Sequence, residues 1–304
     1  METWPALDYS AWKETRDTLH LWTQMAGKVK LALCPFLNQW WEVTLHLTPR
    51  GLNSGLIPGR GQESFDIDFD FYDHRVRVRL SDGRTEEVAL QPRTVADFYA
   101  AFMAALSTLG VEPSISSTPS EVQDATPFEQ DMAHASYDSE AVQRFHRVML
   151  GAARAMERFR TPFHGKSSPV QFFWGGFDLS TARFNGKLIP VKAEGGPIME
   201  FGEDQENFAV GFWPGDGRLR EAAFYAYIVP ALEGVAAASV QPAAGAYDAA
   251  LGEFVLRYED VRSSASPEDD LVAFFQSAYE ATAALAGWDR AALEGHVPAR
   301  HHAR

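Results

Sequence analysis

The amino-acid sequence predicts an α+β fold in which two similar halves each run helix, antiparallel sheet, helix. Apolar residues recur every three or four positions in several long segments, the period of an amphipathic helix. In shorter segments they alternate with polar residues, the period of a half-buried strand. The order of these segments repeats after residue 138. We interpret the repeat as an internal duplication.

The first helix is predicted over residues 12–33, where apolar side chains follow one another at three, four or seven positions. They are Trp12, Leu19, Trp22, Ala26, Val29 and Leu33. Pro35 ends this helix, because proline lacks the backbone N–H that a helix interior needs. Residues 38–48 then alternate between apolar and polar side chains, which predicts a half-buried strand.

A β-hairpin is predicted over residues 65–80. Aspartates alternate with apolar residues in its first strand and arginines do so in its second: Asp66, Asp68, Asp70, Arg75, Arg77 and Arg79. With Tyr72 and Asp73 in the turn, each aspartate lies opposite an arginine, and each pair contributes at most about 1 kcal/mol. The aspartates are therefore expected to be paired with arginines and not to bind a metal.

The first half closes with one more strand and a helix. Asp82-Gly83 is a favoured tight-turn pair and leads into a strand over residues 85–90. Thr94 is expected to cap the next helix, with Asp97 three positions later, and Gly110 to end it.

Composition sets the domain boundaries. Residues 1–111 form the N-terminal α+β half, and residues 112–138 read as an acidic linker rich in Ser and Pro. No lysine or arginine occurs between Arg93 and Arg144. The C-terminal α+β half covers residues 139–290, and residues 291–304 form a terminal tail that is expected to be mobile.

The second half repeats the order of the first. A helix is predicted over residues 139–160, followed by the strands 170–177, 208–213, 222–229 and 253–258. The last helix is expected to begin with Ser266 as its cap and Pro267 at its first position. Residues 235–247 are rich in Ala, Gly and Pro and predict a long loop.

Composition also narrows the function classes. The net charge of −14 opposes binding to nucleic acid and to anionic lipid. No apolar run approaches the roughly 20 residues of a membrane span, and no export signal is evident, so we expect a cytoplasmic protein. One cysteine, Cys34, allows no intrachain disulfide. Scattered histidines and missing nucleotide motifs lead us to expect no metal and no cofactor; the oligomeric state is left open.

One polar face of the first helix is a candidate site. Asp17, His20, Gln24 and Lys28 follow one another at three or four positions and share a face opposite the apolar stripe. They could bind an anion or exchange a proton. The alternative is a solvated helix face on which Asp17 pairs with His20.

Three further segments combine aromatic and polar residues. They are Asn38-Gln39-Trp40-Trp41, the stretch from Trp174-Gly175-Gly176 to Asp178 and Arg183, and Glu206 with Trp213 and Tyr227. Paired glycines often mark a close approach of ligand or backbone. Each segment also has a structural interpretation, as core packing or as an ordinary salt bridge.

Taken together, several sequence strings resemble a family of bacterial proteins known only as a domain of unknown function. The strings are T-L-H-L-W-T-Q-M-A-G-K, N-Q-W-W-E-V-T-L, S-P-V-Q-F-F-W-G-G-F-D-L and G-F-W-P-G. The resemblance spans nearly the whole chain and implies a bacterial protein, but no activity. The family pattern has a His-Glu pair ahead of G-F-W-P-G, where this sequence has Gln205-Glu206.

Three functions remain open. The preferred hypothesis is a small-molecule binding protein with an aromatic-lined pocket between the two halves. Its expected ligand-binding residues are Trp22, Gln24, Asn38, Trp41, Trp174, Asp178, Trp213 and Tyr227. The alternative is a hydrolase or transferase with His20 or Glu206 as general base, and with Lys28 or Arg183 stabilising negative charge. The third hypothesis is a protein-interaction module with its tryptophans on an exposed patch.

Overall fold

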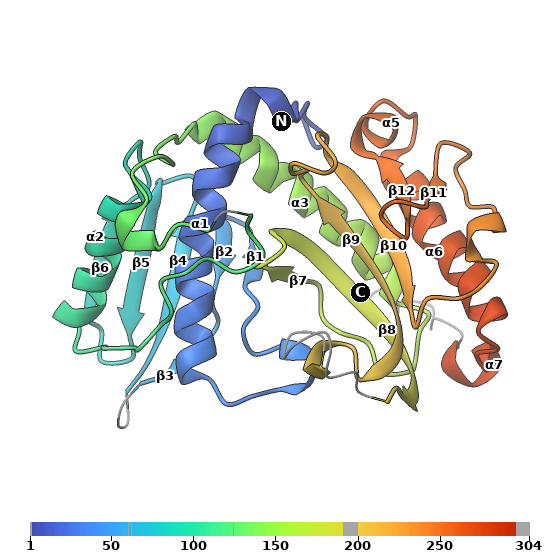
Figure 1. Cartoon of the computed structure of the whole chain (residues 1–304), viewed down its shortest axis with the longest axis horizontal. Helices are drawn as coiled ribbons and strands as arrows, with labels where there is room; N and C mark the ends of the chain where they lie inside the picture. The colour runs from blue at the N-terminus through green and yellow to red at the C-terminus, as the bar shows by residue number, and fades with distance from the viewer. Residues whose placement is uncertain (1, 60, 62, 124, 191–199, 296–304) are drawn as a thin grey trace, which may run out of the picture. The chain divides into compact units, whose positions relative to one another are not determined.

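The computed structural model describes residues 2–59, 61, 63–123, 125–190 and 200–295. They form two six-stranded antiparallel sheets with helices, which confirms the predicted α+β class (Figure 1). The helices are α1 (Tyr9–Leu33), α2 (Val95–Thr108), α3 (Ser139–Arg160), α5 (Tyr258–Arg262), α6 (Pro267–Leu285) and α7 (Arg290–Leu293).

The first sheet has the order β1-β2-β4-β5-β6, and β3 also pairs with β4. Its strands are β1 (His46–Thr48), β2 (Gly51–Asn53), β3 (Ile57–Pro58), β4 (Ser64–Asp70), β5 (Arg75–Leu80) and β6 (Thr85–Ala89). The second sheet has the order β11-β12-β10-β9-β8-β7. Its strands are β7 (Gln171–Phe173), β8 (Asp178–Leu188), β9 (Gln205–Trp213), β10 (Ala223–Val229), β11 (Ala246–Asp248) and β12 (Glu253–Arg257).

The chain divides into two compact units. The first unit contains residues 1–150, 171–179 and 213–222, and the second contains residues 151–170, 180–212 and 223–304. Residues 112–138, which have the composition of a linker, belong to the first unit. Of the predicted tail, α7 reaches Leu293, and residues 296–304 lie outside the described residues.

Helix α1 is confirmed, and it is more deeply buried than an amphipathic helix. The Asp8 side chain caps its first turn by accepting a hydrogen bond from the Ser10 N–H at 2.8 Å. Every residue from 18 to 30 is buried, polar ones included. The apolar stripe therefore predicted the helix, but not the burial of its other face.

The strand predicted over residues 38–48 is wrong for most of its length. Residues Asn38–Trp40 form a short 3₁₀ helix, and β1 begins only at His46. Gln39 and Trp40 both have φ of 57°, in the left-handed region that an extended strand cannot contain. A local turn thus interrupts the alternating pattern, and the residue types in this segment did not predict it.

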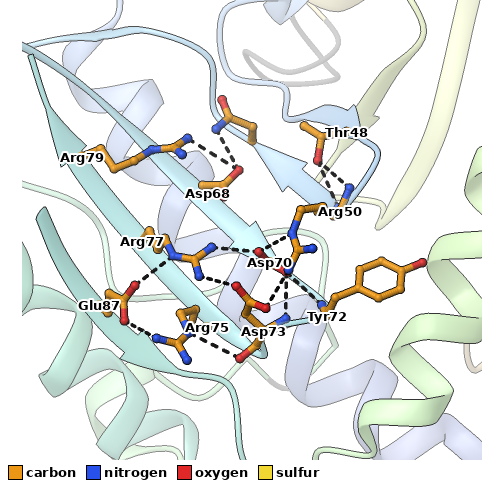
Figure 2. Close-up of polar contacts among 12 residues, drawn as sticks. Thr48, Arg50, Asp68, Asp70, Tyr72, Asp73, Arg75, Arg77, Arg79 and Glu87 are labelled. Carbon is orange, nitrogen blue, oxygen red and sulfur yellow. Dashed lines mark hydrogen bonds and ion pairs between the residues drawn. The ribbon is translucent and has the colours of Figure 1, made fainter.

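The predicted hairpin is confirmed, register included. The paired positions are Asp66↔Arg79, Asp68↔Arg77 and Asp70↔Arg75. Figure 2 shows how the side chains use this register: Asp70 accepts hydrogen bonds from Arg50 and from the diagonal Arg77, at 2.7 and 2.8 Å. Burial alone would raise the pKa of Asp70, but these guanidinium groups hold it well below its usual range.

Of the two helix N-caps predicted from the sequence, one makes the expected capping hydrogen bond and the other does not. The Thr94 hydroxyl accepts a hydrogen bond from the Asp97 N–H at 3.0 Å and begins α2, as predicted. Pro267 does occupy the start of α6, but the Ser266 side chain makes no capping hydrogen bond. Ser266 has φ of −140° and ψ of 68°, outside the extended conformation of an N-cap.

In the second half the strands are placed as predicted, with two differences. The strand predicted over residues 170–177 shortens to β7, because Trp174–Phe177 form a turn. The eleven-residue strand β8 was not predicted. The predicted loop over residues 235–247 contains one short 3₁₀ helix and ends where β11 begins.

Each unit has an aromatic core. In the first, Trp22 stacks on Phe98 at 4.3 Å between ring centroids. In the second, the Tyr279 ring contacts Phe159 and Phe208 edge-on, at 6.2 and 5.5 Å. Among the helices of the described chain, none has the length and apolar character needed to cross a membrane.

Candidate functional site

The polar face of α1 is covered by protein and not by solvent. His20 and Lys28 are each 5% exposed and Gln24 is fully buried. Asp17 pairs with Lys13 and Arg16, at 2.6 and 2.8 Å. The interpretation as a solvated face with an Asp17–His20 pair is therefore wrong, and the groups that cover this face define the candidate site.

His20 is held as a neutral imidazole. Its Nε2 lies 2.8 Å from the carbonyl oxygen of Gly175, so Nε2 carries the proton and donates it. Burial, reinforced by the nearby charge of Arg16, lowers the pKa of His20 to about 3. A pKa this low makes His20 a weak proton acceptor near neutral pH.

Gln24 clamps the segment that follows Pro119. Its Oε1 accepts a hydrogen bond from the Ser120 N–H, and its Nε2 donates one to the Ser120 carbonyl, both at 2.8 Å. This two-way contact fixes the orientation of the amide. It also satisfies both backbone groups of Ser120, which places the Ser120 side chain beside α1.

Lys28 lies one turn further along the same face. Its Nζ donates a hydrogen bond to the Ser120 hydroxyl at 3.1 Å and lies 5.8 Å from the centre of the Trp174 ring. Burial lowers the pKa of Lys28. Over the described residues Lys28 forms no ion pair, so it is a buried cation without a protein counter-charge.

The turn after β7 packs directly on the helix. The Trp174 indole donates a hydrogen bond to the Val43 carbonyl at 2.8 Å. Its ring covers Gly27 so closely that a Cβ on residue 27 would lie 2.0 Å from the indole nitrogen. Gly27 is therefore required for this close approach.

Glu121 completes the site. A Cβ on Gly175 would lie 2.1 Å from Glu121 Oε1, so the carboxylate rests against the Gly175 backbone. Burial of the carboxyl group raises the pKa of Glu121, and the charge of Arg218 opposes that shift. Arg218 in turn stacks on Trp213 at 5.0 Å. Parts of two strings that carry the family resemblance, the one on α1 and the one that contains Gly175, therefore meet around Ser120 and Glu121.

Several residues of the first unit that the sequence predicted as ligand-binding make their contacts with residues other than Ser120 and Glu121. Trp22 stacks between Phe98 and Tyr137 within the core. Asn38 is exposed and donates a hydrogen bond to Gln39, and Trp41 follows in the same turn. The Asp178 carboxylate lies close to Gly176, because a Cβ there would be 2.8 Å from its Oδ1.

Three predicted residues belong to the second unit. Arg183 is fully buried and donates a hydrogen bond to the Phe159 carbonyl near the end of α3. Its guanidinium also lies 3.5 Å from the Phe159 ring centre and 4.3 Å from that of Tyr279. Aromatic faces and a helix C-terminus both stabilise a cation, so these contacts account for Arg183 as a core residue.

Glu206 and Tyr227 have local partners in the same unit. Glu206 accepts a hydrogen bond from Asn185 and lies 3.8 Å from Lys187 Nζ. Gln205, which stands where the family pattern has histidine, accepts one from Lys166 at 3.2 Å. Tyr227 stacks with Tyr225 at 6.0 Å.

Sequence reasoning missed Ser120 and Glu121. Both lie in the Ser/Thr/Pro-rich stretch whose composition reads as a linker, and no local period marks them. The one available signal was that polar side chains on α1 need partners if they are buried. Across the described residues no group of three or more His, Cys, Asp or Glu side chains is arranged to hold a metal ion.

No curated protein and no solved structure matched the chain. A family model, described as a family of unknown function (DUF5996), matches residues 4–295. This range includes every residue of the candidate site, and it confirms the resemblance to a full-length family of unknown function. The chain belongs to the DUF5996 family.

Proposed function

We propose that this protein binds a small organic molecule carrying a carboxylate, and that Lys28 recognises that carboxylate. The observation that carries the proposal is the burial of Lys28 without an ion-pair partner among the described residues. A buried charge left unpaired costs several kcal/mol. A bound carboxylate would offset part of that cost.

The groups beside Lys28 suit the rest of such a ligand. The Trp174 indole offers flat apolar surface, 5.8 Å from Lys28 Nζ. The Glu121 carboxyl, with its raised pKa, can donate a hydrogen bond when protonated and attract a cationic group when ionised. Since all of these residues belong to the first unit, the proposal is narrower than the pocket between halves expected from sequence.

The test compares binding of small carboxylic acids with binding of their neutral amides. Native mass spectrometry of the untagged protein comes first and reports any molecule that co-purifies. Thermal unfolding and calorimetric titration then follow a panel of acids with wild type, Lys28→Met and Lys13→Met. Lys13 lies on the same helix but is 40% exposed, which makes it the matched control.

We expect acids to stabilise wild type and Lys13→Met, and amides to stabilise neither. Lys28→Met removes the charge at nearly the same length and should abolish the effect. Equal stabilisation of folded Lys28→Met would contradict the proposal, and so would a panel in which no acid binds wild type.

A second candidate is acyl transfer, favoured by the 3.1 Å contact between Lys28 Nζ and Ser120 Oγ. Neutral Lys28 would take the Ser120 proton while Oγ attacks an acyl carbonyl carbon, and the leaving group would then take that proton. An ester on Ser120 would remain. His20, with a pKa of about 3, suits the part of general base less well.

A fluorophosphonate probe tests this second candidate. Intact mass should show one adduct on wild type and on Ser117→Ala, and none on Ser120→Ala or Lys28→Met. If wild type stays unlabelled while it binds carboxylates, the site is a binding site without acyl-transfer activity.

A further inference from the structure

Strand β6 is an edge strand of the first sheet. β6 ends the strand order, and within the described chain no strand pairs with its outer side. Figure 1 shows β6 next to α2. An open strand edge presents unpaired backbone groups that can accept an added strand.

The register shows which backbone groups face outward. Two backbone hydrogen bonds flank the β5–β6 ladder: Leu80 N–H to Arg84 C=O at 2.9 Å and Leu90 N–H to His74 C=O at 2.8 Å. Because bonded pairs alternate in an antiparallel ladder, Glu86 and Val88 bond inward to β5. The N–H and C=O groups of Thr85, Glu87 and Ala89 therefore face outward, and in the described part of the chain they have no other backbone partner.

A groove runs beside this open edge. Its volume is about 300 Å³ and β6 forms one wall. The wall from α2 consists of short side chains: Ala101, Ala104, Ala105 and Thr108. Short side chains leave room for those of an added strand, and an open edge beside a groove is the arrangement used in peptide recognition by strand addition.

Charge indicates what kind of strand would fit. Glu86 and Glu87 both line the groove. Glu87 is paired with Arg75 and Arg77, whereas Glu86 forms no ion pair with any described residue. Arg93 lines the groove beyond the other end of β6. The groove therefore has an acidic end and a basic end.

We propose that β6 binds an extended segment of a partner protein as an additional antiparallel strand, with an acidic, a small apolar and a basic side chain at alternate positions. The apolar side chain would enter the groove opposite Val88. The basic side chain would lie beside Glu86 and the acidic one toward Arg93. A second copy of β6 fits less well, because it would bring glutamates from both copies to one edge.

The test uses a capped peptide T-E-T-V-T-K-T and its charge-reversed form T-K-T-V-T-E-T. Backbone amide shifts of the full-length protein are followed by NMR at millimolar peptide. We expect the first peptide to shift the Glu87 and Ala89 amides and the second to bind about tenfold more weakly. The Glu86→Lys variant should reduce or reverse this preference.

A matched pair of variants tests the groove. Ala104→Trp fills it, whereas Ala100→Trp places the same side chain on an exposed part of α2 outside the groove. The first should abolish peptide binding and the second should not. The proposal is overturned if the T-E-T-V-T-K-T peptide shifts no β6 amide, if both peptides bind equally, or if the edge instead forms a dimer that peptide cannot disrupt.

Discussion

The hairpin β4–β5 and the polar face of α1 both carry rows of polar side chains, yet they differ in how those residues find partners. In the hairpin, Asp66 meets Arg79 thirteen positions away, and both remain partly exposed. On α1, His20 meets Gly175 at a separation of 155 positions and is almost fully buried. Local spacing thus reveals exposed pairs, while buried ones depend on distant segments.

The largest expected effect is a loss of folding stability in acid that comes from buried His20. Because the folded-state pKa of His20, about 3, lies below its ordinary value of 6.5, the unfolded chain binds a proton first as pH falls. His20 therefore makes folding less favourable between pH 6.5 and 3. The free energy of unfolding should therefore be lower at about pH 4.5 than at about pH 7.5, and His20 should account for about 2 to 3 kcal/mol of this loss.

Urea unfolding at both pH values measures this effect. His20→Gln should lose less stability on acidification than wild type, by that amount. His164→Gln, a control at an exposed position, should lose as much stability on acidification as wild type does. Parallel losses in wild type and His20→Gln would mean that His20 is not kept neutral.

The second largest effect is a loss of stability when the contact between α1 and Trp174 is overpacked. Gly27→Ala should destabilise the protein by about 2 kcal/mol, because overpacking against the indole exceeds the helix preference for alanine of about 1 kcal/mol. Gly217→Ala is the control, since a Cβ there has no atom within 4 Å. Chemical denaturation measures both, and a stabilised Gly27→Ala would show that Trp174 does not rest on this residue.

A smaller effect is expected at the clamp on Ser120. Gln24→Leu removes two hydrogen bonds and leaves the backbone groups of Ser120 unsatisfied, at a cost of about 1 to 2 kcal/mol. Hydrogen exchange of the Ser120 amide should accelerate. Gln130→Leu, at an exposed position, should leave exchange unchanged, and unaltered exchange in Gln24→Leu would argue against the clamp.

The smallest effect is expected in the hairpin. A double-mutant cycle on Asp66 and Arg79 should give a coupling of about 0.2 to 1 kcal/mol, because both side chains are partly exposed. The coupling should shrink in high salt. A coupling as large as the His20 effect would remove the contrast between the two regions.

Prediction from sequence succeeded for elements whose signals are local. The hairpin register follows from alternation and turn position, and the start of α2 follows from Thr94 as its cap. It failed at Gln39 and Trp40, whose positive φ angles have no residue-type signal, since non-glycine residues rarely adopt them. The strand β8 also went unpredicted.

For the candidate site, sequence spacing placed His20, Gln24 and Lys28 on one face of one helix, because the helical period alone determines which side chains align. Only the tertiary structure brought Ser120, Glu121 and the Trp174–Gly175 turn to that face. The physical reason is that burial turns polar groups into groups that require partners, and segments distant in sequence supply them here.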